Sequence, residues 1–161
     1  MPKISSILFV CLGNICRSPA ADGVMRDVCA KRRVCLFIDS AGIGPWHVGD
    51  LPDSRMRRCG ARHGYTFNHV ARQVCSADFD KFDLIVGMDN ENMRSLLSKV
   101  TTDTQKRKVV CLADYMTNHN EYTTIPDPYY GDERDFELAL ELIEDGVCGL
   151  LNHILLSNER K

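Results

Sequence analysis

Residues 7–19 of the chain read Ile-Leu-Phe-Val-Cys-Leu-Gly-Asn-Ile-Cys-Arg-Ser-Pro. The first four residues form a continuous apolar run, which predicts a buried β-strand. At the other end, Ser18 is a good helix N-cap, and Pro19 suits the first helical position because no backbone hydrogen bond is lost there. The stretch therefore predicts a strand, a tight loop and the start of a helix.

The loop between that strand and that helix is suited to binding phosphate. A helix N-terminus offers free N–H groups and the positive end of the helix dipole. Gly13 and Asn14 tolerate the backbone dihedrals that a cradle of inward N–H groups requires. Arg17 adds a planar fork that matches two phosphate oxygens, and the same positive field favours the thiolate form of Cys11. We therefore predict a cysteine nucleophile at the floor of an anion site; the alternative is a buried Cys11 with a surface Arg17.

Strands and helices are expected to alternate along the rest of the chain. Further strands are predicted at residues 34–38, 84–88 and 109–112, and helices at residues 19–31, 54–62, 90–99 and 134–156. This alternation is typical of an α/β protein whose parallel sheet is covered by helices on both faces. At 161 residues the chain is expected to form one domain, residues 1–161. Such sheets bind ligands beyond the carboxyl ends of their strands, which directs attention to residues 11–18, 40–46, 89 and 114–130.

Charge and hydropathy argue against two classes of partner. The net charge is −2 at pH 7, so no global field attracts nucleic acid or an acidic membrane. No apolar run approaches the ~20 residues of a membrane-spanning helix. Residues 4–12 have some features of a signal peptide, but their apolar stretch is short and is interrupted by Ser5 and Ser6. A buried first strand is therefore the favoured interpretation.

Eight cysteines are scattered along the chain, at positions 11, 16, 29, 35, 59, 75, 111 and 148. No two of them form a CxxC pair, and scattered thiols are typical of the reducing cytoplasm, where we expect the protein to reside. Zinc requires clustered ligands at short spacings, and the nearest approach is Cys59 with His63, without a second pair. We therefore expect neither a metal site nor another cofactor.

Several motifs together resemble one protein family. Residues 10–19 are similar to the phosphate loop of the low-molecular-weight protein tyrosine phosphatases. Four shorter motifs follow in that family's order and spacing: Asp39-Ser40-Ala41-Gly42, Ala71-Arg72-Gln73, Met88-Asp89 and Asp127-Pro128-Tyr129-Tyr130. The resemblance covers nearly the whole chain. It implies a four-stranded parallel sheet with the flavodoxin-like order 2-1-3-4, and hydrolysis of phosphotyrosine through a phosphocysteine on Cys11.

The resemblance also assigns roles to individual residues. Asp127 lies between two prolines and by itself is an ordinary turn aspartate, but the family match implies the general acid that protonates the leaving phenol. Asn14, Ser18 and His69 form a supporting group in the family; taken alone, His69 is a loop histidine. Phosphate binding is expected from Arg17 and from the loop residues Leu12, Gly13, Asn14, Ile15, Cys16 and Ser18.

Three aromatic residues are expected to wall the pocket. Trp46, the only tryptophan, lies in a Gly/Pro-rich loop, and together with Tyr129 and Tyr130 it suits a bound phenyl ring. A packed loop anchor is the alternative for Trp46. Cys16 beside Cys11 is typical of a reversible oxidation switch, with a buried inert thiol as its alternative.

Rival functions account for fewer of these residues. Arsenate reductases on the same scaffold need two further cysteines after the third strand, where residues 87–92 read Gly-Met-Asp-Asn-Glu-Asn. A phosphocysteine carrier of sugar transport needs neither Arg17 nor Asp127, and an inactive phosphotyrosine-binding module needs neither Cys11 nor Asp127. We therefore expect a monomeric enzyme that acts on phosphotyrosine proteins or aryl phosphates and is inhibited by phosphate and vanadate.

Overall fold

The computed structural model describes residues 3–160. Its strands are β1 (Ser6–Cys11), β2 (Phe37–Gly42), β3 (Leu84–Gly87) and β4 (Val109–Cys111). Its helices are α1 (Arg17–Arg32), α2 (Ser54–Arg62), α3 (Asp78–Lys81), α4 (Asn90–Lys99), α5 (Asp103–Lys108) and α6 (Glu133–Glu159), with a 3₁₀ helix, η1, at Leu112–Tyr115. Within the described residues, none of these helices has the length and apolar character to cross a membrane.

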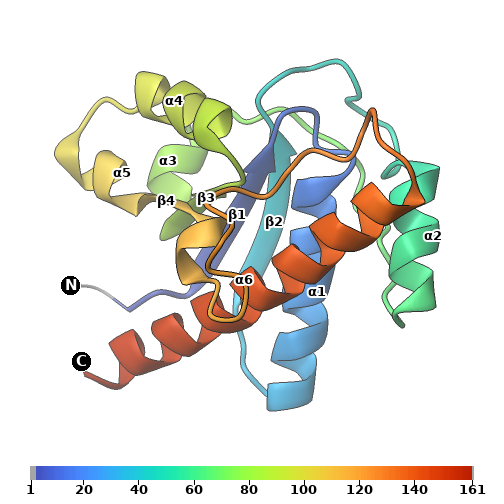
Figure 1. Cartoon of the computed structure of the whole chain (residues 1–161). Coiled ribbons are helices and arrows are strands. Elements are labelled where there is room, and N and C mark those ends of the chain that lie inside the picture. Colours follow the sequence, from blue (N-terminus) through green and yellow to red (C-terminus); the bar gives the residue numbers. More distant parts are fainter. Residues whose placement is uncertain (1–2, 161) are drawn as a thin grey trace.

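The four strands form one parallel sheet in the order β2-β1-β3-β4, which confirms the predicted fold class (Figure 1). The register aligns the last residues of neighbouring strands, pairing Cys11 with Gly42, and Gly87 with both Val10 and Cys111. The carboxyl ends of all four strands therefore meet at one edge of the sheet, where a parallel sheet binds its ligand.

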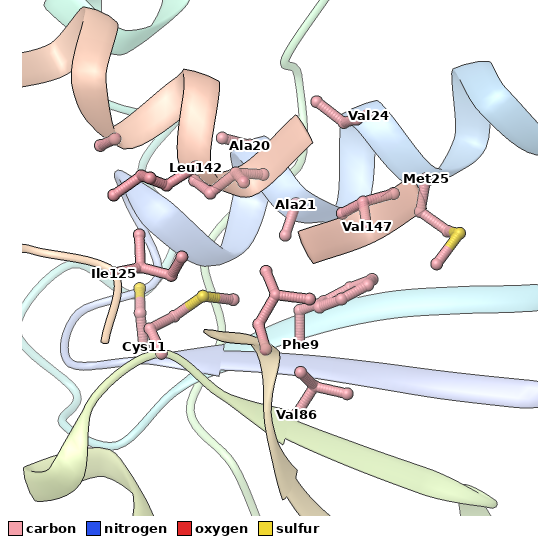
Figure 2. Close-up of a cluster of buried hydrophobic side chains, with 14 of the residues drawn as sticks. Phe9, Cys11, Ala20, Ala21, Val24, Met25, Val86, Ile125, Leu142 and Val147 are labelled. Atoms are coloured by element: carbon pink, nitrogen blue, oxygen red, sulfur yellow. The ribbon is translucent and has the colours of Figure 1, made fainter. Parts of the chain in front are cut away.

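Helices cover both faces of the sheet. Successive residues of a strand point to opposite faces. Ile7 and Phe9 accordingly join the core beneath α1 and α6, whereas Leu8 and Val10 pack with α3 and α4. Figure 2 shows Phe9 and Val86 on the sheet beneath α1 and α6. Each residue of β1 is buried, so the strand that carries the phosphate loop is held on both sides.

Two helices begin and end where the sequence predicts, at residues 54–62 and 90–99. The side chain of Asp53 accepts from the Arg55 N–H to cap α2, and that of Asp89 accepts from the Asn92 N–H to cap α4. These caps satisfy N–H groups that no helical carbonyl reaches, and they fix the helix starts.

The prediction for the second strand is wrong by several residues, because β2 begins at Phe37 and ends at Gly42 instead of spanning residues 34–38. The Val34 N–H still donates to the Cys29 carbonyl and belongs to the end of α1. The strand then continues through the polar residues 39 and 40, which hydropathy alone does not assign to a buried strand. The short helices α3, α5 and η1 are too brief to leave a periodic signal.

Candidate active site

The loop between β1 and α1 turns its carbonyl groups away from a pocket. The Cys11 carbonyl accepts from the Ile43 N–H at 3.0 Å. The Leu12 carbonyl accepts from the Gly44 N–H at 2.9 Å. In a trans peptide the following N–H points the opposite way, so the N–H groups of Leu12 and Gly13 are directed towards the pocket that these residues line. Converging N–H groups suit an anion.

Asn14 holds this loop from beneath. Its backbone is left-handed, with φ of 60°. Its side-chain oxygen accepts from the Arg72 N–H at 3.0 Å. Its amide nitrogen donates to the Ser18 hydroxyl at 2.8 Å and to the Ser40 hydroxyl at 3.0 Å. Asn14 is fully buried, so it shapes the phosphate loop and does not line the pocket.

Gly42, at the end of β2, lets the loop lie close to the sheet. A Cβ atom at this position would be 2.9 Å from the carbonyl carbon of Gly13 and 3.0 Å from the backbone nitrogen of Asn14. Backbone atoms cannot turn aside as a flexible side chain can, so the close approach requires glycine here.

The predicted N-cap at Ser18 is wrong. Helix α1 begins at Arg17, its N-cap is Cys16, and the Cys16 side chain makes no capping hydrogen bond. Pro19 is therefore the third helical residue and not the first. The Ser18 hydroxyl lies 3.0 Å from Cys11 Sγ instead. A capping side chain would compete with phosphate for the first helical N–H groups, which gives a physical reason for this arrangement.

Arg17 is 2% exposed, and its guanidinium is held by two acceptors. Nη1 donates to Asp89 Oδ2 at 2.7 Å and to the Ile125 carbonyl at 2.8 Å. These bonds fix the guanidinium plane and leave its Nε–Nη2 edge for two phosphate oxygens. Asp89 was not among the predicted site residues, although the rule about strand ends had pointed to its position.

Asp127 faces the same pocket from a different loop. Its Oδ1 accepts from the Tyr129 N–H at 3.1 Å, and its Oδ2 lies 3.5 Å from Arg17 Nη2. The loop is joined to the sheet by a bond of 2.8 Å from the Ile125 N–H to the Met88 carbonyl. The carboxyl is 37% exposed, so it has access to both substrate and water.

The pocket has a volume of about 370 Å³. It is lined by Cys11, Leu12, Gly13, Ile15, Cys16, Arg17, Trp46, His47, Asp127, Tyr129 and Tyr130. Trp46 is 66% exposed and Tyr130 is 97% exposed, and the rings of Tyr129 and Tyr130 meet edge to face with centroids 5.0 Å apart. Of the lining residues, sequence reasoning missed only His47, for which adjacency to Trp46 was the available signal.

His69 lies outside this pocket. Its Nδ1 is 3.7 Å from Asp22 Oδ2 and 3.6 Å from Asp39 Oδ1. Asp39 also pairs with Arg72 at 3.0 Å, and the backbone of Arg72 is bound by Asn14. His69 is thus connected to the phosphate loop through other residues.

The pair Cys59 and His63 gains a third potential ligand, Glu137 of α6, with the ligand atoms within 4.8 Å of one another. Arg62 already donates to Glu137 Oε1 at 2.8 Å, and His63 Nε2 lies 2.6 Å from its Oε2. Burial, together with Glu137, raises the pKa of Cys59 to about 11, so its thiol is protonated at neutral pH. A metal ion would have to compete with Arg62 for this carboxylate.

Known proteins match this chain over nearly its whole length. The family model of the low molecular weight phosphotyrosine protein phosphatases matches residues 6–160. The low molecular weight protein-tyrosine-phosphatase YfkJ of Bacillus subtilis is 43% identical over 155 residues, which are 92% of this chain and 95% of the relative.

Solved structures of phosphatases also superpose on this chain over most of its length. A protein tyrosine phosphatase from Entamoeba histolytica, crystallised with Hepes in its active site, superposes with a TM-score of 0.91 at 39% identity, covering 95% of this chain and 98% of that one. DARP, a Drosophila arginine phosphatase, gives a TM-score of 0.85 at 33% identity, covering 91% and 96% of the two chains. The chain therefore belongs to the low molecular weight phosphotyrosine protein phosphatase family, whose members are hydrolases.

Proposed function

We propose that this phosphatase hydrolyses phosphotyrosine and small aryl phosphates through a phosphocysteine intermediate on Cys11. One observation carries the proposal: Cys11, the buried Arg17 and the partly exposed Asp127 line one pocket of about 370 Å³. A nucleophile, an anion-binding fork and a proton donor are the groups that this reaction requires. Membership of the family supports the same chemistry.

The reaction proceeds in two displacements at phosphorus. Arg17 and the loop N–H groups bind the phosphate dianion, the Cys11 thiolate attacks phosphorus, and the bond to the phenol oxygen breaks as Asp127 donates its proton to that oxygen. The Asp127 carboxylate then takes a proton from water, whose oxygen attacks phosphorus. The sulfur–phosphorus bond breaks, which releases phosphate and restores the thiolate. The guanidinium and the amides supply the positive charge for both steps.

The aromatic wall favours phosphotyrosine as the substrate. Trp46, Tyr129 and Tyr130 stand around the mouth of the pocket, where they can enclose a phenyl ring while its phosphate reaches Cys11. Phosphoserine is too short to span the same depth. DARP is named as an arginine phosphatase, so phosphoarginine is the competing substrate class that an assay has to include.

We further propose that the enzyme acts as a monomer in the cytoplasm. All eight cysteines lie within the described residues and are free thiols, which suits a reducing compartment. Phosphate and vanadate are expected to inhibit by competing for the phosphate loop. Size-exclusion chromatography and cell fractionation test these two points independently of the chemistry.

The decisive experiment replaces the proton donor. A phenol of high pKa needs the proton of Asp127 as it leaves, whereas a nitrophenol hardly does. Asp127→Asn is therefore expected to lose a factor of roughly 10²–10⁴ on phosphotyrosine, and much less with the best aryl leaving groups. Burst-phase kinetics of phosphocysteine formation across a series of aryl phosphates measure this dependence, with no metal added.

Two further variants complete that experiment. Asp103→Asn, which replaces an exposed carboxyl group of α5, is the control and is expected to behave as the wild type. Cys11→Ser is expected to bind phosphate without turnover. An equal loss for every leaving group in Asp127→Asn contradicts its role as the acid. Faster hydrolysis of phosphoarginine than of phosphotyrosine contradicts the proposed substrate.

A further inference from the structure

Asp53 joins α2 to the phosphate loop. It lies immediately before α2, and its backbone N–H donates to the Ile15 carbonyl of the phosphate loop at 2.7 Å. Its carboxylate also caps the helix by accepting from the Arg55 N–H at 2.8 Å. The start of α2 is therefore fixed relative to the residues that bind phosphate.

The guanidinium of Arg55 forms a fork-to-fork pair with the same carboxylate. Nε donates to Asp53 Oδ1 at 3.1 Å and Nη2 donates to Asp53 Oδ2 at 2.9 Å. Hydrogen bonding from Arg55 holds the pKa of Asp53 below its ordinary value, so the carboxylate stays charged at neutral pH. Because Asp53 already caps the helix through a backbone bond, this second pair is not needed to begin α2.

Arg55 continues from this pair to the loop that carries Asp127. Its Nη2 donates to the Tyr129 carbonyl at 3.0 Å, and its guanidinium lies 5.5 Å from the centroid of the Tyr129 ring and 4.7 Å from that of Phe136. The N–H of Tyr129 donates to Asp127 Oδ1 at 3.1 Å. Figure 1 shows α2 beside the amino-terminal end of α6, close to where this loop ends.

We propose that Arg55 is a positioning residue, which clasps the Asp127 loop to the phosphate loop and thereby sets where the proton donor stands over the leaving oxygen. The inference rests on the proposed function, because it assigns Arg55 a part in the step that Asp127 performs. Arg55 does not line the active-site pocket, so it acts through Tyr129 and not on the substrate. A small displacement of an acid from the oxygen that it must protonate lowers the rate strongly.

The test is Arg55→Gln, measured with the leaving-group series. We expect the burst-phase rate constant of phosphocysteine formation from phosphotyrosine to fall by roughly ten- to a hundredfold, with a much smaller loss for aryl phosphates whose phenols leave without a proton. The inhibition constants of phosphate and vanadate should stay within about twofold of the wild-type values, because the phosphate loop keeps its own contacts. Arg55→Lys, which keeps the charge without the fork, serves as the second variant if glutamine prevents folding.

Two comparisons distinguish positioning from a merely structural role. Arg58→Gln changes a neighbouring arginine of the same helix and is expected to leave every constant unchanged. In the Asp127→Asn background, Arg55→Gln should cause no further loss on phosphotyrosine, because the group that it positions is gone.

The possible failures are separable. Suppose that the wild type and Asp127→Asn behave as expected, but that Arg55→Gln lowers the rate by the same factor with every leaving group or does not lower it at all. The positioning role of Arg55 is then wrong, and the proposed function stands. Full additivity of Asp127→Asn and Arg55→Gln in the double variant likewise contradicts the positioning role of Arg55. If Asp127→Asn itself shows no dependence on the leaving group, the proposed function fails first.

Discussion

Arg17 is a charged side chain with almost no exposed surface, and a buried charge is costly unless other groups compensate it. Asp89 and the Ile125 carbonyl compensate this charge by accepting hydrogen bonds from Arg17 Nη1 at 2.7 and 2.8 Å. The phosphate loop motif was enough to predict that Arg17 binds an anion. Its partner lies 72 residues away at the end of another strand, and no local pattern says which aspartate at that edge will reach it. Sequence reasoning therefore predicts Cys11 as the nucleophile and Arg17 as the anion-binding group, but it misses the residues that hold the Arg17 guanidinium in place.

Cys16 provides a prediction at the same scale. Burial, then Asp53 and Cys11, raise the pKa of the Cys16 thiol, so it stays protonated at neutral pH and does not compete as a nucleophile. When peroxide oxidises Cys11 to a sulfenic acid, the Cys16 thiol can condense with it, forming a disulfide and releasing water. We expect dithiothreitol to restore activity in the wild type, and to restore much less in Cys16→Ser, where Cys11 proceeds to sulfinic acid.

Recovered activity after timed peroxide exposure measures this difference, and mass spectrometry detects the Cys11–Cys16 link. Cys148→Ser, in an exposed thiol of α6, is the control and should recover like the wild type. Equal recovery with and without Cys16 removes it from the switch.

At the scale of elements, polar residues with a function in the site explain the errors of sequence reasoning. β2 contains Asp39 and Ser40, whose side chains bind Arg72 and Asn14 and so cannot be apolar. The prediction from hydropathy consequently placed this strand too early in the sequence, at residues 34–38 instead of Phe37–Gly42. Serine is a residue type favoured at helix N-caps, but the Ser18 hydroxyl lies 3.0 Å from Cys11 Sγ in the site instead. Where the side chain before the helix does cap it, as Asp53 does at α2 and Asp89 at α4, the predicted bounds are confirmed.

The loop that leads to Asp127 is anchored by one carboxylate of α6, which gives a prediction for an element. Asp145 accepts from the N–H groups of Thr117 and Asn118, both at 3.0 Å, and lies 2.8 Å from His119 Nδ1. Burial alone raises the pKa of Asp145, but the bonds from His119, Thr117 and Asn118 outweigh it and hold the pKa below 3.8. The bond to Asp145 raises the pKa of His119 above 6.5.

The signs of these shifts define a pH window. Stability from Asp145 is present above pH 3.8 and is lost as the pH falls through its lowered pKa. Stability from protonated His119 is present below pH 6.5 and is lost as the pH rises through its raised pKa. Asp145→Asn should therefore lower the free energy of unfolding most between these values. Urea denaturation across the pH range measures it, with Glu159→Gln, at an exposed position of α6, as control. A deficit that does not vary with pH contradicts the charged pair.

At the scale of the whole molecule, the sequence was sufficient to predict a parallel sheet because β1, β3 and β4 are short apolar runs, each followed by a break, and helices alternate with the strands. The strand order came from the resemblance and not from periodicity, since hydropathy does not say which strands are neighbours. The links between distant loops, such as Arg55 to Tyr129, arise only when the chain is folded. The single domain stays a prediction, and we propose that the cores on the two faces of the sheet unfold together.

Gly149 allows a test of that proposal. A Cβ atom there would lie 1.8 Å from the Tyr115 carbonyl oxygen, so Gly149→Ala must push α6 away from η1. Alanine favours helix by about 1 kcal/mol over glycine, but overpacking against rigid backbone typically costs about 1–3 kcal/mol or more. The clash should therefore prevail and lower the free energy of unfolding. Cys148→Ala, at the neighbouring exposed position, should change it little.

Two probes report on different parts of the molecule during urea denaturation. Far-ultraviolet circular dichroism follows the helices, and the fluorescence of Trp46, the only tryptophan, follows the mouth of the pocket. If the chain is one cooperative unit, the two midpoints coincide in the wild type and shift together in Gly149→Ala, although Trp46 lies on a loop after β2 and the substitution is in α6. A fluorescence midpoint that stays in place while the helical signal shifts would mean that the two parts unfold independently, and the single domain would then be wrong.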